Sequence, residues 1–455
     1  MDILIAILGL GFLIFVHELG HFMAARGVGI GVHRFSIGFG PATPIHFRRG
    51  KTEYLVAWIP LGGYVKMASH EEQQEMETLE GGAVEEVFPD DELFENKPLW
   101  ARILVLSAGV LMNILTAWII YVGIAAGYGR SELATTTVAE VAAETLPEGA
   151  SALASLPAGS QITAVGDTTI DTWNTMVRAV LDSPAGPTTL RFANNPAVTV
   201  DLGDESERRA LAGSLVPRMP AKVGEVAPGR AADRAGLESG DRIVAIDGQP
   251  TPSWAALVDM LKGAPGQELQ LSVERLVDGQ IKSLEIAITP ETHDVKDPET
   301  GETRQEGKIG IGADPDTIRI PLSFGEALNE GTQRTWFTAG QIVGVLKGLF
   351  QREVSPRDLG GPIAIVQISG QASRAGLEIF LAFLAFLSVN LAVLNLLPIP
   401  ALDGGHLIFL FAEGLRGGKP LPLEWRHRLL NIGVLMLLAL MVFVFGNDIL
   451  RILGW

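Results

Sequence analysis

Four apolar stretches are the feature that most limits what this chain can fold into. They cover residues 3–25, 103–126, 379–397 and 429–445. A hydrocarbon core about 30 Å thick is crossed by roughly 20 helical residues, so each stretch is long enough, or nearly long enough, to span a bilayer. Lipid offers no partners for backbone polar groups, which favours helices. We therefore expect a polytopic α-helical membrane protein with four transmembrane helices.

Composition agrees with a chain of separate apolar and polar blocks. Hydrophobic residues make up 47% of the 455 residues, yet 52 residues are acidic, so the polar residues must be segregated from the apolar stretches. The formal net charge of -17 argues against nucleic acid as a partner, because phosphate groups are neutralised by clustered Lys and Arg. Cysteine is absent, which fits many compartments and decides little.

The first apolar stretch has the position of a cleavable signal peptide and ends in Met23-Ala24-Ala25. A signal peptide opens with a positively charged segment, whereas this stretch opens with Asp2 and no basic residue. We therefore expect it to be retained as a transmembrane helix.

Basic residues beside the spans predict the orientation, because cytoplasmic loops are enriched in Lys and Arg. The loop after the first span is basic, as is the short loop between the third and fourth spans, and nothing basic precedes the first span. Both loops should be cytoplasmic, with both termini and the large region between spans two and three outside. The basic residues are Arg26, Arg34, Arg48, Arg49, Lys51 and Lys66, and then Arg416, Lys419, Arg426 and Arg428.

These assignments give an order of segments. Within the outer region, residues 341–350 are apolar but only about half the spanning length, so we expect an amphipathic helix on the outer membrane surface. The predicted segments are transmembrane 1–25, 99–128, 376–412 and 429–455, cytoplasmic 26–98 and 413–428, and periplasmic 129–215, 216–315 and 316–375.

The outer region contains two copies of one sequence pattern. Residues 157–165 match residues 238–246, and Trp173 corresponds to Trp254, each opening a short helix. The second copy, with its Gly240-Asp241-Arg242-Ile243 motif, resembles PDZ domains of bacterial envelope proteases, which bind extended peptides at a sheet edge. We expect a tandem, β-rich PDZ insertion that either binds peptides or sterically restricts access to the membrane.

The first copy departs from this pattern. Ser160 stands where the second copy has Asp241, and Gly166-Asp167 inverts the order of Asp247-Gly248. The first domain, residues 129–215, is accordingly a degenerate PDZ domain whose peptide binding is open.

A five-residue motif, His17-Glu18-Leu19-Gly20-His21, lies inside the first span. Residues four apart share one face of a helix, so His17 and His21 can direct their imidazoles at one metal ion with Glu18 beside them. Ionisable residues inside a span are costly and mark functional sites. Zn²⁺ with two nitrogen ligands needs a third ligand and keeps one position for water, and Glu18 is placed to act as the general base.

The third ligand should come from the third span, which runs inward like the first span and ends at the same depth. Pro398 and Pro400 break this helix while the sequence is still apolar, and Gly404-Gly405 permits a tight turn around Asp403. Asp403 is the predicted third ligand. His406 is the alternative, since zinc accepts either residue type.

The motif at His17 and the sequence from Asn395 to Gly405 together resemble the paired signatures of the site-2 protease family of intramembrane zinc metalloproteases. The resemblance covers essentially the whole chain. It implies Zn²⁺ bound by His17, His21 and Asp403, catalysis by Glu18, and contact of Asn395 with the substrate backbone.

With the tandem insertion, the resemblance is to family members of the inner membrane of Gram-negative bacteria. It implies cleavage of single-pass membrane proteins in envelope stress signalling. The substrates would be a trimmed anti-sigma factor and signal peptide remnants.

The segment after the first span resembles the membrane-dipping β-loop of this family. Residues 35–41, 54–60 and 61–67 are predicted to form short strands with Gly turns. We expect Gly62, Gly63 and Tyr64 to bind the unwound substrate as an added edge strand; the alternative is an ordinary cytoplasmic hairpin. The acidic residues between 71 and 95 are assigned no chemistry.

The second span contains a glycine and an amide at helical spacing. Gly109 and Asn113 are four residues apart, which suits close helix packing with one polar contact.

Other functions remain open. The His, Glu and Asp groups within the first and third spans could serve a transporter or an ion-binding protein, and the insertion could serve a scaffold without catalysis.

Overall fold

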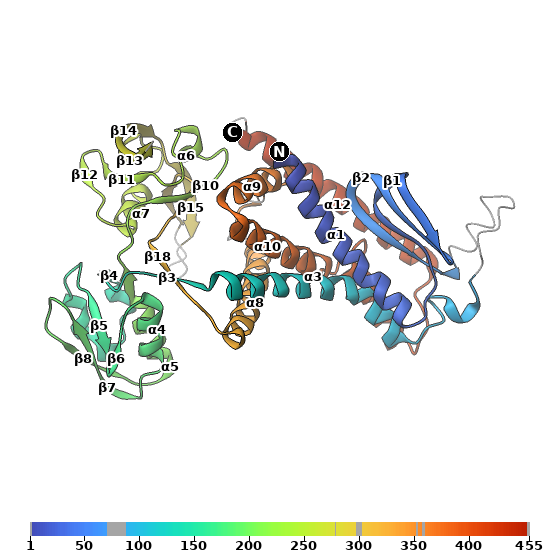
Figure 1. The fold of residues 1–455 in the computed structure, drawn as a ribbon, viewed down its shortest axis with the longest axis horizontal. Helices are drawn as coiled ribbons and strands as arrows, with labels where there is room; N and C mark the ends of the chain where they lie inside the picture. The colour runs from blue at the N-terminus through green and yellow to red at the C-terminus, as the bar shows by residue number, and fades with distance from the viewer. Residues whose placement is uncertain are drawn as a thin grey trace. The chain divides into compact units, whose positions relative to one another are not determined.

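The computed structural model describes residues 2–70, 88–277, 279–296, 303–351, 354–356 and 360–452. The chain divides into two compact units, of which one comprises residues 1–128 and 322–449 and the other residues 129–321 and 450–455. The first unit is mainly helical and the second contains most of the strands (Figure 1).

Four helices in the described chain are long and apolar enough to cross a bilayer, which agrees with the predicted number of spans. They are α1 (Asp2–Gly27), α3 (Leu99–Tyr128), α10 (Leu377–Asn395) and α12 (Leu423–Ile452). Helix α12 is longer than the apolar stretch that predicted it, because polar residues at both ends continue the helix.

Helix α3 is the centre of the helical unit, with α1 and α10 packed against it. At the α1–α3 contact, a Cβ atom on Gly20 would lie 2.5 Å from the carbonyl oxygen of Ala108, so the two backbones approach as only glycine allows. At the α10–α3 contact, the Ser388 hydroxyl donates a hydrogen bond of 2.8 Å to the carbonyl oxygen of Asn113.

The amphipathic helix predicted at residues 341–350 is part of a much longer helix, α8 (Phe324–Gln351). One face of α8 packs against α3 and α10 instead of remaining free: Ile342 is buried in an apolar cluster with Tyr121 and Val389. Trp118 also donates a hydrogen bond of 2.9 Å from Nε1 to Thr332. Two further described helices, α9 (Pro362–Ala375) and α11 (Asp403–Leu415), belong to this unit.

The segment after α1 forms two long strands, β1 (Val32–Arg49) and β2 (Thr52–Met67), where three short strands were predicted. The register is irregular: residues 34–37 of β1 pair with residues 53–56 and also with residues 63–66. Because one stretch of β1 pairs on both sides, the segment is a small folded sheet. Most of the acidic stretch that follows, residues 71–87, lies outside the described residues, and residues Asp90–Glu92 form the 3-10 turn η1.

The second unit contains two sheets with the same strand order. One is β6-β5-β7-β8 and the other is β12-β11-β13-β14, and each has a short helix between its second and third strands in the sequence. The bounds are β5 (Ile162–Val165), β6 (Thr168–Thr169), α4 (Trp173–Leu181), β7 (Gly186–Phe192) and β8 (Val198–Leu202), and β11 (Arg242–Ile246), β12 (Gln249–Pro250), α7 (Trp254–Lys262), β13 (Leu269–Val277) and β14 (Gln280–Ile288).

Each of these sheets has its own apolar core. Met176 and Leu190 are fully buried in the first, and Leu257 and Leu271 in the second. The helices start in the same way, because the Thr172 and Ser253 hydroxyls accept hydrogen bonds from backbone N–H groups three residues ahead. The remaining elements are β3 (Arg130–Leu133), β4 (Val138–Val141), η2 (Ala143–Thr145), η3 (Glu148–Ser155), α5 (Glu205–Ser214), β9 (Leu215–Pro217), β10 (Val223–Val226), α6 (Ala231–Arg234), β15 (Glu291–Lys296), β16 (Thr303–Lys308), β17 (Ile311–Ala313) and β18 (Thr317–Ile320).

The sequence difference between Asp241 and Ser160 concerns internal packing. The Asp241 carboxylate is fully buried and accepts two hydrogen bonds of 2.7 Å from the Arg275 guanidinium on β13. Ser160 is also buried and accepts a hydrogen bond of 2.8 Å from Asn195. Neither side chain is available to a ligand, so this difference does not decide whether the first domain binds peptides.

Candidate metal centre

Helix α1 brings the two histidines of the sequence motif to one face. The Nε2 atoms of His17 and His21 are 3.2 Å apart, and both side chains are buried. This arrangement follows from the four-residue spacing, which superposes side chains on consecutive turns of an α-helix.

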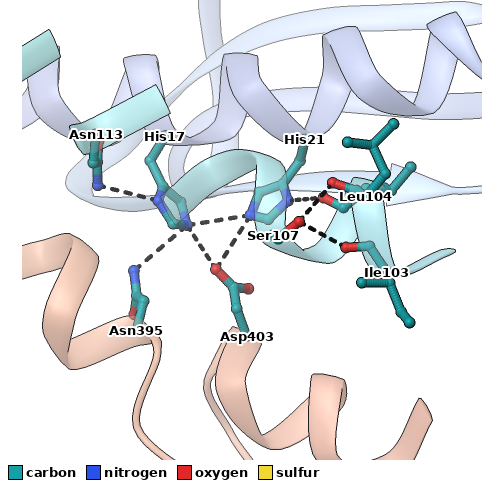
Figure 2. A network of polar contacts seen from close by, with 9 residues as sticks. His17, His21, Ile103, Leu104, Ser107, Asn113, Asn395 and Asp403 are labelled. Atoms are coloured by element: carbon teal, nitrogen blue, oxygen red, sulfur yellow. Dashed lines mark hydrogen bonds and ion pairs between the residues drawn. The ribbon is translucent and has the colours of Figure 1, made fainter. Parts of the chain in front are cut away.

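Asp403, the first residue of α11, completes the cluster (Figure 2). Its Oδ2 atom lies 3.2 Å from His17 Nε2 and 3.4 Å from His21 Nε2. Asp403, and not the alternative His406, therefore joins the histidines in the only three-residue group of metal-ligand type found in the described part of the chain.

The chain reaches this position through the break that the sequence predicted between α10 and α11. A Cβ atom on Gly404 would overlap the carbonyl oxygens of Leu396 and Leu397, and one on Gly405 would overlap that of Ile399. Neither glycine has a positive φ, so backbone conformation does not require glycine here. The close approach of α11 to the preceding loop does.

The donor set suits a zinc ion. The three ligand atoms, two imidazole nitrogens and one carboxylate oxygen, lie within 4.8 Å of one another. The Nδ1 atom of His21 is 2.8 Å from the carbonyl oxygen of Val105, which can only accept a hydrogen bond, so the proton of this imidazole is on Nδ1 and Nε2 is free to coordinate. Three protein ligands and one open position are typical of a catalytic zinc.

Helix α3 leaves room for the centre at Gly109. A Cβ atom at this position would lie 2.7 Å from Cε1 and 2.8 Å from Nε2 of His17, and closer still to Nε2 of His21. The sequence suggested helix packing for this glycine, whereas the structure places it against the two nitrogens that would coordinate metal. In the sequence, Gly109 is marked only by its four-residue spacing from Asn113, and this spacing does not show which residues Gly109 packs against.

Glu18 lies beside this cluster and against β2. A Cβ atom on Gly63 would lie 2.9 Å from Cγ of Glu18 and 2.9 Å from the carbonyl oxygen of Ser36. The strand that contains Gly63 therefore passes directly over the side chain expected to act as the base. An aromatic contact holds the same sheet on α1, since the rings of Phe22 and Phe35 are 5.3 Å apart.

Of the other predicted substrate-binding residues, Asn395 lies at the histidine cluster, and Gly62 and Tyr64 lie on either side of Gly63 on β2. Asn395 ends α10 with its Nδ2 atom 3.5 Å from His17 Nε2. Gly62 has φ +96°, which favours glycine, and Tyr64 accepts a hydrogen bond of 3.4 Å from Arg34. In the described strand pairings, residues 63–67 pair only with residues 32–37, so their other edge carries no strand.

Comparison with known proteins identifies the family. The sequence model of Peptidase family M50 matches residues 5–440, nearly the whole chain. The chain is a member of this family. It is therefore a metalloprotease that depends on zinc, and the transporter alternative is not favoured.

Named relatives match this chain over nearly their full length. Protease RseP of Yersinia pestis is 34% identical over 98% of each chain, and the Regulator of sigma-E protease RseP of Escherichia coli is 32% identical over 99% of each chain. A Neisseria meningitidis protein with the name "Putative zinc metalloprotease" is 32% identical over 97% of each chain. Together with the four apolar helices, these matches show an intramembrane zinc protease of the site-2 type.

Proposed function

We propose that this metalloprotease binds Zn²⁺ through His17, His21 and Asp403 and cleaves peptide bonds within transmembrane segments of single-pass proteins. The observation that carries the proposal is the convergence of these three ligand atoms within 4.8 Å, on two apolar helical segments far apart in the sequence. At a rise of 1.5 Å per residue, His17 is about 20 Å along α1, which favours a site inside the bilayer.

Glu18 is the general base in this proposal. Bound zinc would lower the pKa of a water molecule and polarise the scissile carbonyl group. The Glu18 carboxylate takes a proton from the attacking water and passes it to the leaving amide nitrogen. Its position beside His17 and under Gly63 supports this role, because the base must lie close to the metal-bound water and to the substrate strand.

The edge of residues 63–67 that carries no strand in the described pairings is the proposed binding place for the substrate backbone. A transmembrane helix must unwind before its peptide bonds can be cleaved, and its backbone groups then need new partners. An added strand obtains them from a sheet edge. Asn395, whose amide both donates and accepts, would hold the strand on the metal side.

The outer region is proposed to be a tandem PDZ pair that favours substrates with a shortened outer domain. Support comes from the matching strand order of its two sheets and from the sequence pattern of the second copy. Because the relatives are named for regulation of sigma-E, we propose a trimmed anti-sigma factor as the main substrate and signal peptide remnants as a second class.

The orientation is part of this proposal. The basic loops favour an inner membrane protein with its termini and PDZ pair in the periplasm and its metal centre near the cytoplasmic side. Reporter fusions in the loop at Arg416 and in the outer region near Asp316 should face opposite compartments, and fusions facing the same side would contradict it.

Cleavage of a single-pass reporter in detergent or vesicles tests the function. We expect the wild type to cleave and Glu18→Gln to bind zinc without cleaving, because the variant keeps the ligands and loses the base. About one zinc per chain should be bound, and His21→Ala should lose it. Equal cleavage by Glu18→Gln and wild type would refute the assignment, and so would full zinc binding by His21→Ala.

A further inference from the structure

Asn113 is a buried amide on α3 that faces the metal centre from behind the ligands (Figure 2). It is fully buried, and its Nδ2 atom lies 3.2 Å from His17 Nδ1. Its Oδ1 atom is buried and has no hydrogen-bond partner among the described residues. A buried carbonyl oxygen without a partner costs about 1–3 kcal/mol, so the environment of Asn113 Oδ1 requires an explanation.

The hydrogen-bond direction at this contact depends on zinc. An amide N–H pointing at Nδ1 of His17 requires Nδ1 to accept, which puts the imidazole proton on Nε2. Nε2 is the nitrogen that faces Asp403 and His21, and zinc needs its lone pair. With zinc bound, the proton must therefore be on Nδ1, where it would meet a second donor.

The two ends of an amide have the same shape, so exchanging them by rotation needs no extra space. The exchange would place Oδ1 about 3.2 Å from Nδ1, at the position that Nδ2 now has. The otherwise unpartnered oxygen would then accept the Nδ1–H of His17, and Nδ2 would take the position where Oδ1 now has no partner among the described residues. His21 already has the equivalent arrangement, with the Val105 carbonyl oxygen 2.8 Å from its Nδ1 atom.

We propose that Asn113 is a positioning residue that accepts a hydrogen bond from His17 Nδ1–H in the zinc-loaded protein and so selects the tautomer that presents Nε2 to the metal. Helix α3 then serves the centre at three positions on one face: the Val105 carbonyl orients His21, Gly109 leaves space, and Asn113 orients His17. This inference rests on the proposed zinc ligands and adds a role for the second span beyond packing.

Zinc affinity of the purified full-length protein, measured by chelator competition, tests the direction of the hydrogen bond. Asn113→Leu has a similar size without an acceptor and should bind zinc about 10–100-fold more weakly than wild type, the usual effect of losing a partner behind a ligand. Asn113→Asp offers only acceptors and should bind zinc at least as tightly as wild type. Melting of the zinc-free variants reports on packing separately.

Three results separate the possibilities. Weak zinc binding by Asn113→Asp would show that the amide must donate, and wild-type affinity in Asn113→Leu would show that no partner is needed; either result overturns the inference and leaves the proposed function intact. Asn113→Asp remains informative even if Asn113→Leu fails to fold. Absence of zinc from the wild type would instead overturn the proposed function.

Discussion

Gly109→Ala is the most specific perturbation that the structure offers. The added methyl group would lie 2.7 Å from Cε1 and 2.8 Å from Nε2 of His17, and closer still to Nε2 of His21. His21 cannot easily turn away, because its Nδ1 atom is held by the Val105 carbonyl oxygen at 2.8 Å. The helix backbone itself should tolerate the change, since alanine stabilises a helix interior by about 1 kcal/mol relative to glycine.

The magnitude follows from the contact distances. Ordinary carbon contacts are about 3.5 Å or longer, so the imidazoles or α3 would have to move by roughly 1 Å. A displacement of that size at a reacting centre can reduce the rate about 100-fold, equivalent to about 2.7 kcal/mol in the activation free energy. We expect zinc affinity to fall in the same variant, because the methyl group would clash with the Nε2 atoms of His17 and His21 that are expected to coordinate zinc.

The assay compares reporter cleavage and zinc content in Gly109→Ala and Gly123→Ala. Gly123 lies in the same helix, and a Cβ atom on it would have no heavy atom within 4 Å, so this control carries the same change in helix propensity without the clash. We expect Gly123→Ala to retain wild-type activity. Wild-type cleavage and zinc affinity in Gly109→Ala would refute the geometry of the centre.

Three further predictions concern other parts of the site. Gly63→Ala should lower cleavage by roughly 10-fold or more while zinc content is unchanged, because its methyl group meets Glu18 and not the metal ligands; loss of zinc would contradict this separation. Glu413→Ala should destabilise the helical unit by about 3–5 kcal/mol in thermal melting, because it leaves the buried Arg102 guanidinium without the carboxylate that it contacts at 2.5 and 3.1 Å. Replacing both residues by methionine should recover much of that loss, and a double variant as unstable as the single one would argue against it. A zinc chelator should abolish cleavage and lower the melting temperature, and both should return on addition of zinc; cleavage that survives complete zinc removal would contradict the mechanism.

The sequence alone determined the features that depend on local periodicity. Apolar stretches of spanning length gave the four transmembrane helices, and the four-residue spacing of His17 and His21 predicted a shared helix face. The repeated pattern around Trp173 and Trp254 predicted two similar domains, and the structure shows the same strand order in both. Such patterns can be recognised because an element a few residues long fixes the relative positions of its own side chains.

The tertiary structure decided which distant residues meet. Asp403 and His406 were both acceptable ligands by residue type, and only the packing of α11 shows that Asp403 reaches the histidines. The irregular register of β1 and β2, and the clustering of Gly63 over Glu18, likewise depend on contacts between separate segments.

Gly109 and Asn113 show the physical reason. Their spacing indicates that they share one face of α3, but a helix rotated about its axis by half a turn would have the same sequence and face different neighbours. That rotation is set by close packing against α1 at Gly20 and by the Ser388 hydrogen bond to α10, which are interactions between helices and leave no periodic signal within either one.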